Sequence, residues 1–132
     1  MTQEEKQLLL KDLYARLPYG VIVKATYKDG EGWKTENRKL LGIYEDSQVY
    51  VDAVYTNIEN VRPYLRPMSS MTEEERKEYN KYIFYGASIG LISNTATAYE
   101  LIDWLNSHHF DYRGIIERGL ALEASEDMYN IK

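Results

Sequence analysis

The strongest constraint on the fold is an abrupt change of hydrophobic period near residue 20. Before it, apolar side chains recur every three or four residues, as on one face of a helix: Leu10, Leu13, Tyr14 and Leu17. After it, apolar side chains alternate with more polar ones, as in a strand with one buried face: Val21, Val23, Ala25 and Tyr27. A helix must therefore pack against a sheet, and we expect an α+β fold.

The first element is a helix over residues 3 to 16. Thr2 and Glu5 have the spacing of a capping box, in which the two side chains satisfy free amide groups at a helix start. Pro18 disfavours helical geometry at Leu17, so the helix should end there.

The rest of the first half predicts a small antiparallel β unit. Asp29-Gly30 is a strong turn signal after the first strand. We expect further strands and one tight turn in this order: strand 33–43, strand 48–54, turn 56–60 and a short extended piece 61–65. A small SH3-like barrel and a plain twisted meander both give this pattern, and both remain open.

The second half predicts a helical unit. Ser70 with Glu73, and Thr72 with Glu75, have capping-box spacing, so a helix should cover residues 73–85. We expect three further segments: a buried connection or partly helical continuation over 86–94, a helix over 98–108 capped by Thr97 with Glu100, and a short helix over 112–118 between Asp111 and Gly119. The chain thus divides into residues 1–66 and residues 67–132, which should share one core.

Charge argues against a nucleic-acid partner. The net charge is −5, and residues 1–66 hold ten acidic and ten basic side chains while residues 67–132 hold eleven and six. Phosphate binding needs a basic surface, and only the first half could supply one, through Lys24, Lys28, Lys34, Arg38 and Lys39. Three acidic residues interrupt that set: Asp29, Glu31 and Glu36. Any nucleic-acid binding by these basic strands should be weak.

The composition also bounds the compartment. The 132 residues include no cysteine, which excludes disulfides, thiolate metal sites and cysteine nucleophiles. No apolar run approaches the ~18 residues of a membrane span, and the start of the chain is acidic and polar. We expect a cytoplasmic protein that has no membrane association and no cofactor.

Chemistry is densest between Ile102 and Gly114. A hydrolytic site could use His108 or His109 as general base, oriented by Asp111. The alternative that we favour is structural: His108 caps one helix and Asp111 starts the next. Adjacent side chains diverge on a helix and on a strand, so the two histidines are poorly placed to share a metal ion, and we expect no metal site.

A non-enzymatic role in protein binding is the function that the sequence favours. The chain has thirteen tyrosines against two phenylalanines, and tyrosine suits thin cores and interaction surfaces. The residues that we expect to meet a protein partner are Trp104, Phe110, Tyr112 and Arg113. For Arg113, an ion pair with Glu117 on the same helix is the competing use. The sequence does not indicate the oligomeric state.

Several segments also carry a resemblance. They are residues 2–6 (Thr-Gln-Glu-Glu-Lys), 17–21 (Leu-Pro-Tyr-Gly-Val), 62–72 (Arg-Pro-Tyr-Leu-Arg-Pro-Met-Ser-Ser-Met-Thr) and 102–114 (Ile-Asp-Trp-Leu-Asn-Ser-His-His-Phe-Asp-Tyr-Arg-Gly). Together they resemble a family of small uncharacterised proteins of gut bacteria and their prophages or other mobile elements. The resemblance implies an intracellular accessory protein of a mobile element. It carries no established activity and no catalytic residue.

Overall fold

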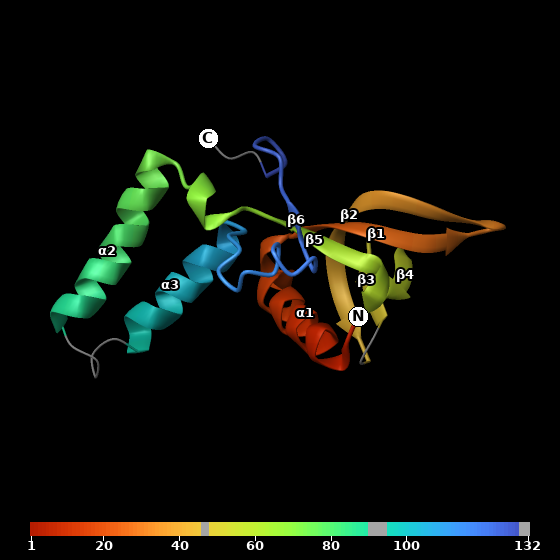
Figure 1. The fold of residues 1–132 in the computed structure, drawn as a ribbon, viewed down its shortest axis with the longest axis horizontal. Coiled ribbons are helices and arrows are strands. Elements are labelled where there is room, and N and C mark those ends of the chain that lie inside the picture. The colour runs from red at the N-terminus through yellow and green to blue at the C-terminus, as the bar shows by residue number, and fades with distance from the viewer. Residues whose placement is uncertain (46–47, 90–94, 130–132) are drawn as a thin grey trace.

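A computed structural model describes residues 1–45, 48–89 and 95–129, and the side chains of all these except residues 84–89 and 95–97. Figure 1 shows the fold. The three helices are α1 (Gln3–Arg16), α2 (Glu73–Ile89) and α3 (Thr95–Ser107). The strands are β1 (Ile22–Asp29), β2 (Gly32–Tyr44), β3 (Gln48–Val51), β4 (Val54–Asn57), β5 (Val61–Leu65) and β6 (Leu122–Glu123). The α+β prediction is confirmed.

Helix α1 has the bounds that its sequence predicts. The Thr2 hydroxyl accepts from the amide of Glu5 at 3.0 Å, and the Glu5 carboxylate accepts from the amide of Thr2 at 2.9 Å. The helix ends at Arg16, and a 3-10 turn over Leu17–Tyr19 leads into β1. The capping box and Pro18 therefore set both ends of the helix.

The strands form one sheet in the order β4-β3-β2-β1-β5-β6, in which only β6 runs parallel to its neighbour. The first four strands are a meander, and β5 returns beside β1. The sheet is rolled. Strands β4 and β1 are not neighbours in the strand order, yet the Thr56 hydroxyl on β4 donates to the carbonyl oxygen of Thr26 on β1 at 2.7 Å. This curvature encloses the core on the side that α1 covers.

One expected strand, over residues 48–54, is wrong. The chain turns at Asp52 and Ala53, both of which have positive φ angles of 37° and 78°. Two short strands, β3 and β4, replace it, and the expected turn over 56–60 is reduced to a 3-10 turn over Ile58–Asn60. A two-residue hairpin turn of this kind normally contains glycine or asparagine, and this turn contains neither.

The main core lies between α1 and the sheet. Its fully buried members include Leu9 and Leu13 of α1 and Val23 of β1. Residues from the second half complete it: Ile115, Leu120 and Ala121. These contacts link residues 67–132 to the first core, whereas the division of the chain after residue 66 stays a prediction.

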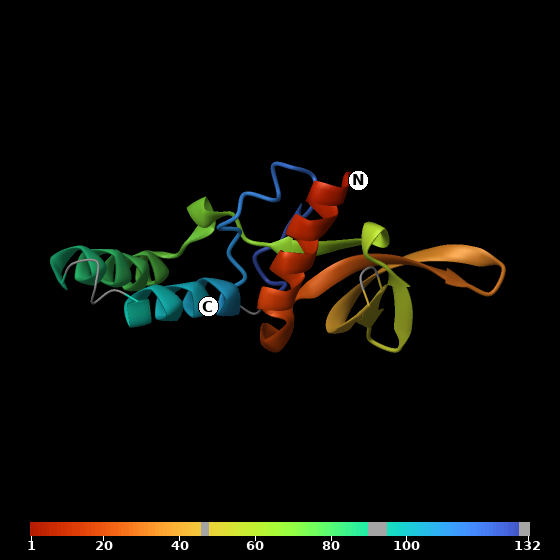
Figure 2. The same cartoon turned by 90° about the horizontal axis from the view of Figure 1, so that it is seen from below.

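Helices α2 and α3 form an antiparallel hairpin, which we call the arm. Figures 1 and 2 show that it extends from one end of the molecule, opposite the projecting β1–β2 hairpin. The start of α2 has the capping box predicted for Thr72 with Glu75. The Thr72 hydroxyl accepts from the amide of Glu75 at 3.1 Å, and the Glu75 carboxylate accepts from the amide of Thr72 at 2.8 Å. Helix α2 continues through residues 86–89, and residues 90–94 of the expected connection lie outside the described residues.

Two expectations for the C-terminal half need correction. Thr97 does not cap a helix, because α3 already begins at Thr95. The expected helix over 112–118 is a set of turns. Asp111 does accept from the amides of Ile115 and Ile116, both at 3.0 Å, and Gly119 ends the turns at a φ of 76°. The left-handed Gly114, at a φ of 71°, interrupts what would have been the first helical turn.

Candidate interaction site

The segment with the densest chemistry forms the joint between the arm and the β unit. His108 closes the last turn of α3: its Nδ1 lies 2.9 Å from the carbonyl oxygen of Trp104, within reach of a hydrogen bond. The Ser107 hydroxyl donates to the same carbonyl at 2.9 Å. The predicted capping role of His108 fits this geometry.

His109 lies inside the joint. Its ring stacks on that of Tyr129 with 3.7 Å between centres, and its φ of 63° is in the left-handed region. Burial, reinforced by the nearby charges of Arg16 and Arg66, lowers the pKa of His109 to about 4. The imidazole is therefore neutral at physiological pH. Its buried Nδ1 has no hydrogen-bond partner among the described residues.

Asp111 is not arranged as the partner of a catalytic histidine. Both carboxylate oxygens accept from backbone amides, those of Ile115 and Ile116. Among the described residues, no hydrogen bond joins Asp111 to His108 or His109. The hydrolase hypothesis therefore gains no histidine–aspartate pair from the structure.

Two of the expected binding residues are buried in the joint. Trp104 stacks against Phe110 with 5.7 Å between ring centres, and its indole N–H donates to Glu78 at 2.7 Å. Phe110 is fully buried, and the Arg66 guanidinium lies over its ring at 4.2 Å from the centre. Neither aromatic ring is presented to a partner, so this expectation is corrected: both are packing anchors.

The other two expected binding residues are also engaged within the chain. The Tyr112 hydroxyl donates to the amide oxygen of Asn106 at 2.9 Å. Arg113 donates to Asp12 at 2.9 Å and not to Glu117, which corrects the expected ion pair. Asp12 also accepts from Arg16 at 2.8 Å, and both of these side chains are fully buried. The carboxylate thus joins α1 to the joint.

Sequence reasoning missed a second buried ion pair that fixes the arm. The Arg66 guanidinium donates to both oxygens of Glu75, at 2.8 and 2.7 Å. The hydrogen bonds from Arg66 lower the pKa of Glu75 to about 2. A capping box is the visible sequence signal at Glu75, and nothing in the local sequence shows that the same carboxylate also binds Arg66.

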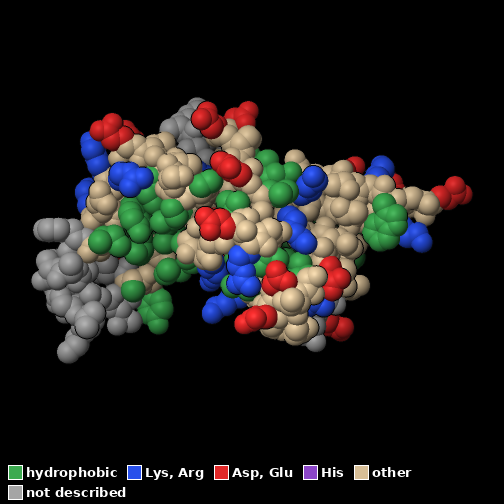
Figure 3. Space-filling view, viewed as in Figure 1, with side chains coloured by type: hydrophobic (Ala, Val, Ile, Leu, Met, Phe, Trp, Pro, Cys, Tyr) green, Lys and Arg blue, Asp and Glu red, His purple; other side chains and the backbone are tan. Residues whose placement is uncertain are grey.

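A first surface that remains open to a partner lies farther out on the arm. Three large apolar side chains there are exposed: Ile83 at 49%, Tyr99 at 69% and Ile102 at 39%. Figure 3 shows hydrophobic side chains gathered over α2 and α3 on the face turned to the viewer. We call Ile83, Tyr99 and Ile102 the arm surface. The sequence signal that could have found it is the run from Tyr82 to Tyr99, which contains no charged residue.

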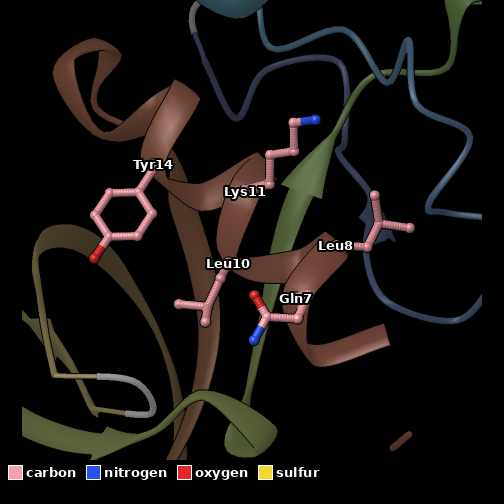
Figure 4. Close-up of a pocket in the computed structure, with 5 residues that line it drawn as sticks. All are labelled: Gln7, Leu8, Leu10, Lys11 and Tyr14. Carbon is pink, nitrogen blue, oxygen red and sulfur yellow. The ribbon is translucent and has the colours of Figure 1, made fainter. Parts of the chain in front are cut away.

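A second candidate surface is a shallow hollow on the outer side of α1. It has a volume of about 460 Å³ and is lined by Gln7, Leu8, Leu10, Lys11 and Tyr14. Figure 4 shows these side chains on successive turns of α1, with Tyr14 and Lys11 diverging. Tyr14 is exposed, but the hollow brings no carboxylate or histidine beside Lys11. It therefore lacks an arrangement for acid–base chemistry.

A third surface is aromatic and lies on the β unit. The Tyr55 ring contacts those of Tyr50 and Tyr44, with 4.7 and 5.7 Å between centres. Gly42 leaves room for them, because a Cβ atom there would lie 3.1 Å from the Tyr44 ring. These tyrosines contact one another, and Tyr44 and Tyr55 remain half exposed.

The described residues contain neither a candidate metal site nor a helix that could span a membrane. Among them, no three acidic or histidine side chains are grouped to hold a metal ion. No helix in the described ranges is long and apolar enough to cross a bilayer. No protein-family model matches the sequence, and no curated protein or solved structure matches it either.

Proposed function

We propose that this chain is a non-enzymatic protein-interaction module that binds its partner through the arm surface. The observation that carries the proposal is the exposure of Tyr99 and Ile102 on α3. The opposite side of this helix already buries Trp104 and Leu105. A helix that is apolar on two sides normally buries both, and the residues that the structure describes cover only one.

The chemistry of the arm surface suggests the nature of the partner. Acidic Glu100 and Asp103 lie on α3 beside Tyr99 and Ile102. Interfaces combine an apolar centre with a charged rim, and tyrosine is favoured at the centre. The expected partner is a protein with an apolar patch rimmed by lysine or arginine. The setting that we propose for this pair is the inside of a bacterial cell that carries a mobile element.

The β unit is proposed to act as a scaffold with the form of a small SH3-like barrel. Three features support this: the strand order with β5 beside β1, the 3-10 turn before β5, and the hydrogen bond from Thr56 to Thr26 across the roll. The buried ion pairs of Asp12 and Arg66 hold the arm to this scaffold. A rigid attachment keeps the binding surface ordered before the partner arrives.

Affinity purification with the tagged full chain, followed by mass spectrometry, tests the proposal. A single partner should be enriched by the native chain and lost with the double substitution Tyr99→Lys and Ile102→Lys. The matched control is Tyr14→Lys with Tyr55→Lys, which changes two exposed side chains away from the arm. Equal recovery with both double variants would contradict the assignment of the surface.

A second copy of the chain is the alternative occupant. Sedimentation velocity of the purified protein distinguishes it. A dimer that the arm substitutions dissociate would place this surface between two copies and would overturn the proposed basic-rimmed partner. We expect a monomer at micromolar concentration.

A further inference from the structure

The sheet face turned away from the core carries basic side chains and no acidic ones. Paired residues in adjacent strands point to the same side of a sheet. The register therefore places ten residues on this outer face: Ile22, Lys24, Thr26 and Lys28 of β1, Trp33, Thr35, Asn37 and Lys39 of β2, and Arg62 and Tyr64 of β5. We call it the basic face. Four of its residues are cationic, and none is aspartate or glutamate.

The charges of the β1–β2 hairpin are sorted between its two sides. On the core side, Lys34 pairs with Asp29 at 3.2 Å, and Arg38 pairs with Glu36 at 2.6 Å. The interruption by acidic residues that the sequence suggests is thus confined to that side and to the turn. Among the ion pairs of the described residues, none involves Lys24, Lys28, Lys39 or Arg62.

Lys24 and Arg62 are direct cross-strand partners. Like charges directly opposite each other in a sheet are destabilising, and no carboxylate on this face offsets them. Arg62 donates instead to the carbonyl oxygens of Val61, Glu59 and Gly119, at 2.8 to 3.1 Å. These bonds hold the guanidinium in place without neutralising it, so a bound anion would relieve the repulsion.

Trp33 adds a second kind of contact. It is 65% exposed and is the cross-strand partner of Lys28, so the two side chains leave the sheet from neighbouring positions on the same face. A base stacked on an exposed aromatic ring contributes about 1 to 3 kcal/mol. Cations beside such a ring are the usual elements of single-strand binding surfaces.

We propose that the basic face binds single-stranded nucleic acid, with the four cations on its phosphates and Trp33 stacked on a base. This function goes beyond the proposed protein interaction and uses a surface on a different part of the molecule. Duplex DNA fits less well. A three-stranded face is broader than the helix or two-stranded ribbon that a major groove of about 12 Å admits.

Fluorescence anisotropy tests the proposal with the full-length protein and labelled 15-nucleotide oligo-dT and oligo-U. We expect binding at low salt. The logarithm of the association constant should fall against the logarithm of the salt concentration with a slope of about −2 to −3, as three or four phosphate contacts require. A duplex of the same length should bind less tightly. An unlabelled poly-glutamate peptide should compete weakly.

Two sets of variants separate the basic face from general charge. Lys24→Glu with Lys28→Glu should abolish binding, whereas Lys11→Glu with Lys77→Glu, an equal change of net charge on helices α1 and α2, should preserve most of it. Trp33→Ala should weaken binding by about 5- to 150-fold while leaving the salt slope unchanged. All these side chains are exposed, and circular dichroism confirms the fold of each variant.

Three results would overturn the proposal. They are no anisotropy change at low salt, an equal loss in both double variants, and poly-glutamate competition as strong as that of unlabelled oligonucleotide. The last result would show a surface for acidic peptides. Because no residue of the arm surface is changed, none of these outcomes bears on the proposed protein partner.

Discussion

The guanidinium of Arg66 donates to both carboxylate oxygens of Glu75, at 2.8 and 2.7 Å, and so joins the end of β5 to the first turn of α2. The Phe110 ring lies beneath the guanidinium at 4.2 Å. Both charged side chains are largely buried. This one bidentate pair therefore fixes where the arm leaves the β unit.

Glu75→Gln should lower the free energy of unfolding by about 3 kcal/mol. The substitution leaves the buried Arg66 without a charged partner, which is the costly way to break such a pair. Urea denaturation followed by circular dichroism measures the change. Glu74→Gln, one residue away and exposed, should change stability by less than about 0.5 kcal/mol, and equal effects in the two variants would contradict this role of the pair.

Stability should fall in two successive steps as the pH is lowered. The pKa of His109 is depressed from 6.5 to about 4, so between these values the unfolded chain binds a proton that the folded chain does not. The free energy of unfolding should fall over that window by up to about 1.4 kcal/mol per pH unit. The pKa of Glu75 is depressed from 4.5 to about 2, and its contribution should be lost between those two values.

His109→Asn isolates the first step. Asparagine tolerates the left-handed backbone at this position but cannot titrate. Urea titrations at pH 7, 6 and 5 should show a shallower loss of stability for the variant than for the native chain, although the variant is less stable at pH 7 because it loses the stacking on Tyr129. Identical pH dependence in the two proteins would assign the acid sensitivity to other groups.

Ala53→Gly should stabilise the protein by about 1 kcal/mol. Ala53 has a φ of 78° in the turn between β3 and β4, and a left-handed residue with a Cβ costs about 1 to 2 kcal/mol that glycine avoids. The midpoint of thermal unfolding gives the comparison. Ala98→Gly, in helix α3, should instead lower the stability. A loss of stability in both variants would contradict the inferred backbone strain at Ala53.

Much of the first half could be predicted because its signals are local. The capping box at Thr2, the proline at residue 18 and the alternation of β1 each act within a few residues. The turn at Asp52 and Ala53 escaped prediction for a physical reason: tertiary pairing of β3 with β4 imposes positive φ angles on residues that do not favour them.

The candidate site could not be predicted in the same way. His108 and Asp111 do cap backbone groups, as their positions suggest. Yet Arg113 pairs with Asp12, which lies 101 residues away in the chain, and Trp104 is covered by α2. Contacts of this separation depend on how the arm folds back, and no local pattern encodes them. The sorting of charges that isolates Lys24 and Arg62 on one face likewise requires the register of three strands.

The central claim is that the arm surface binds a protein partner, and calorimetric titration with the purified partner tests it most directly. The account predicts that Tyr99→Lys with Ile102→Lys raises the dissociation constant by about 100-fold, since two central interface residues contribute about 3 kcal/mol or more together. Tyr14→Lys with Tyr55→Lys should leave it within about two-fold. Native affinity in the arm variant would contradict the account.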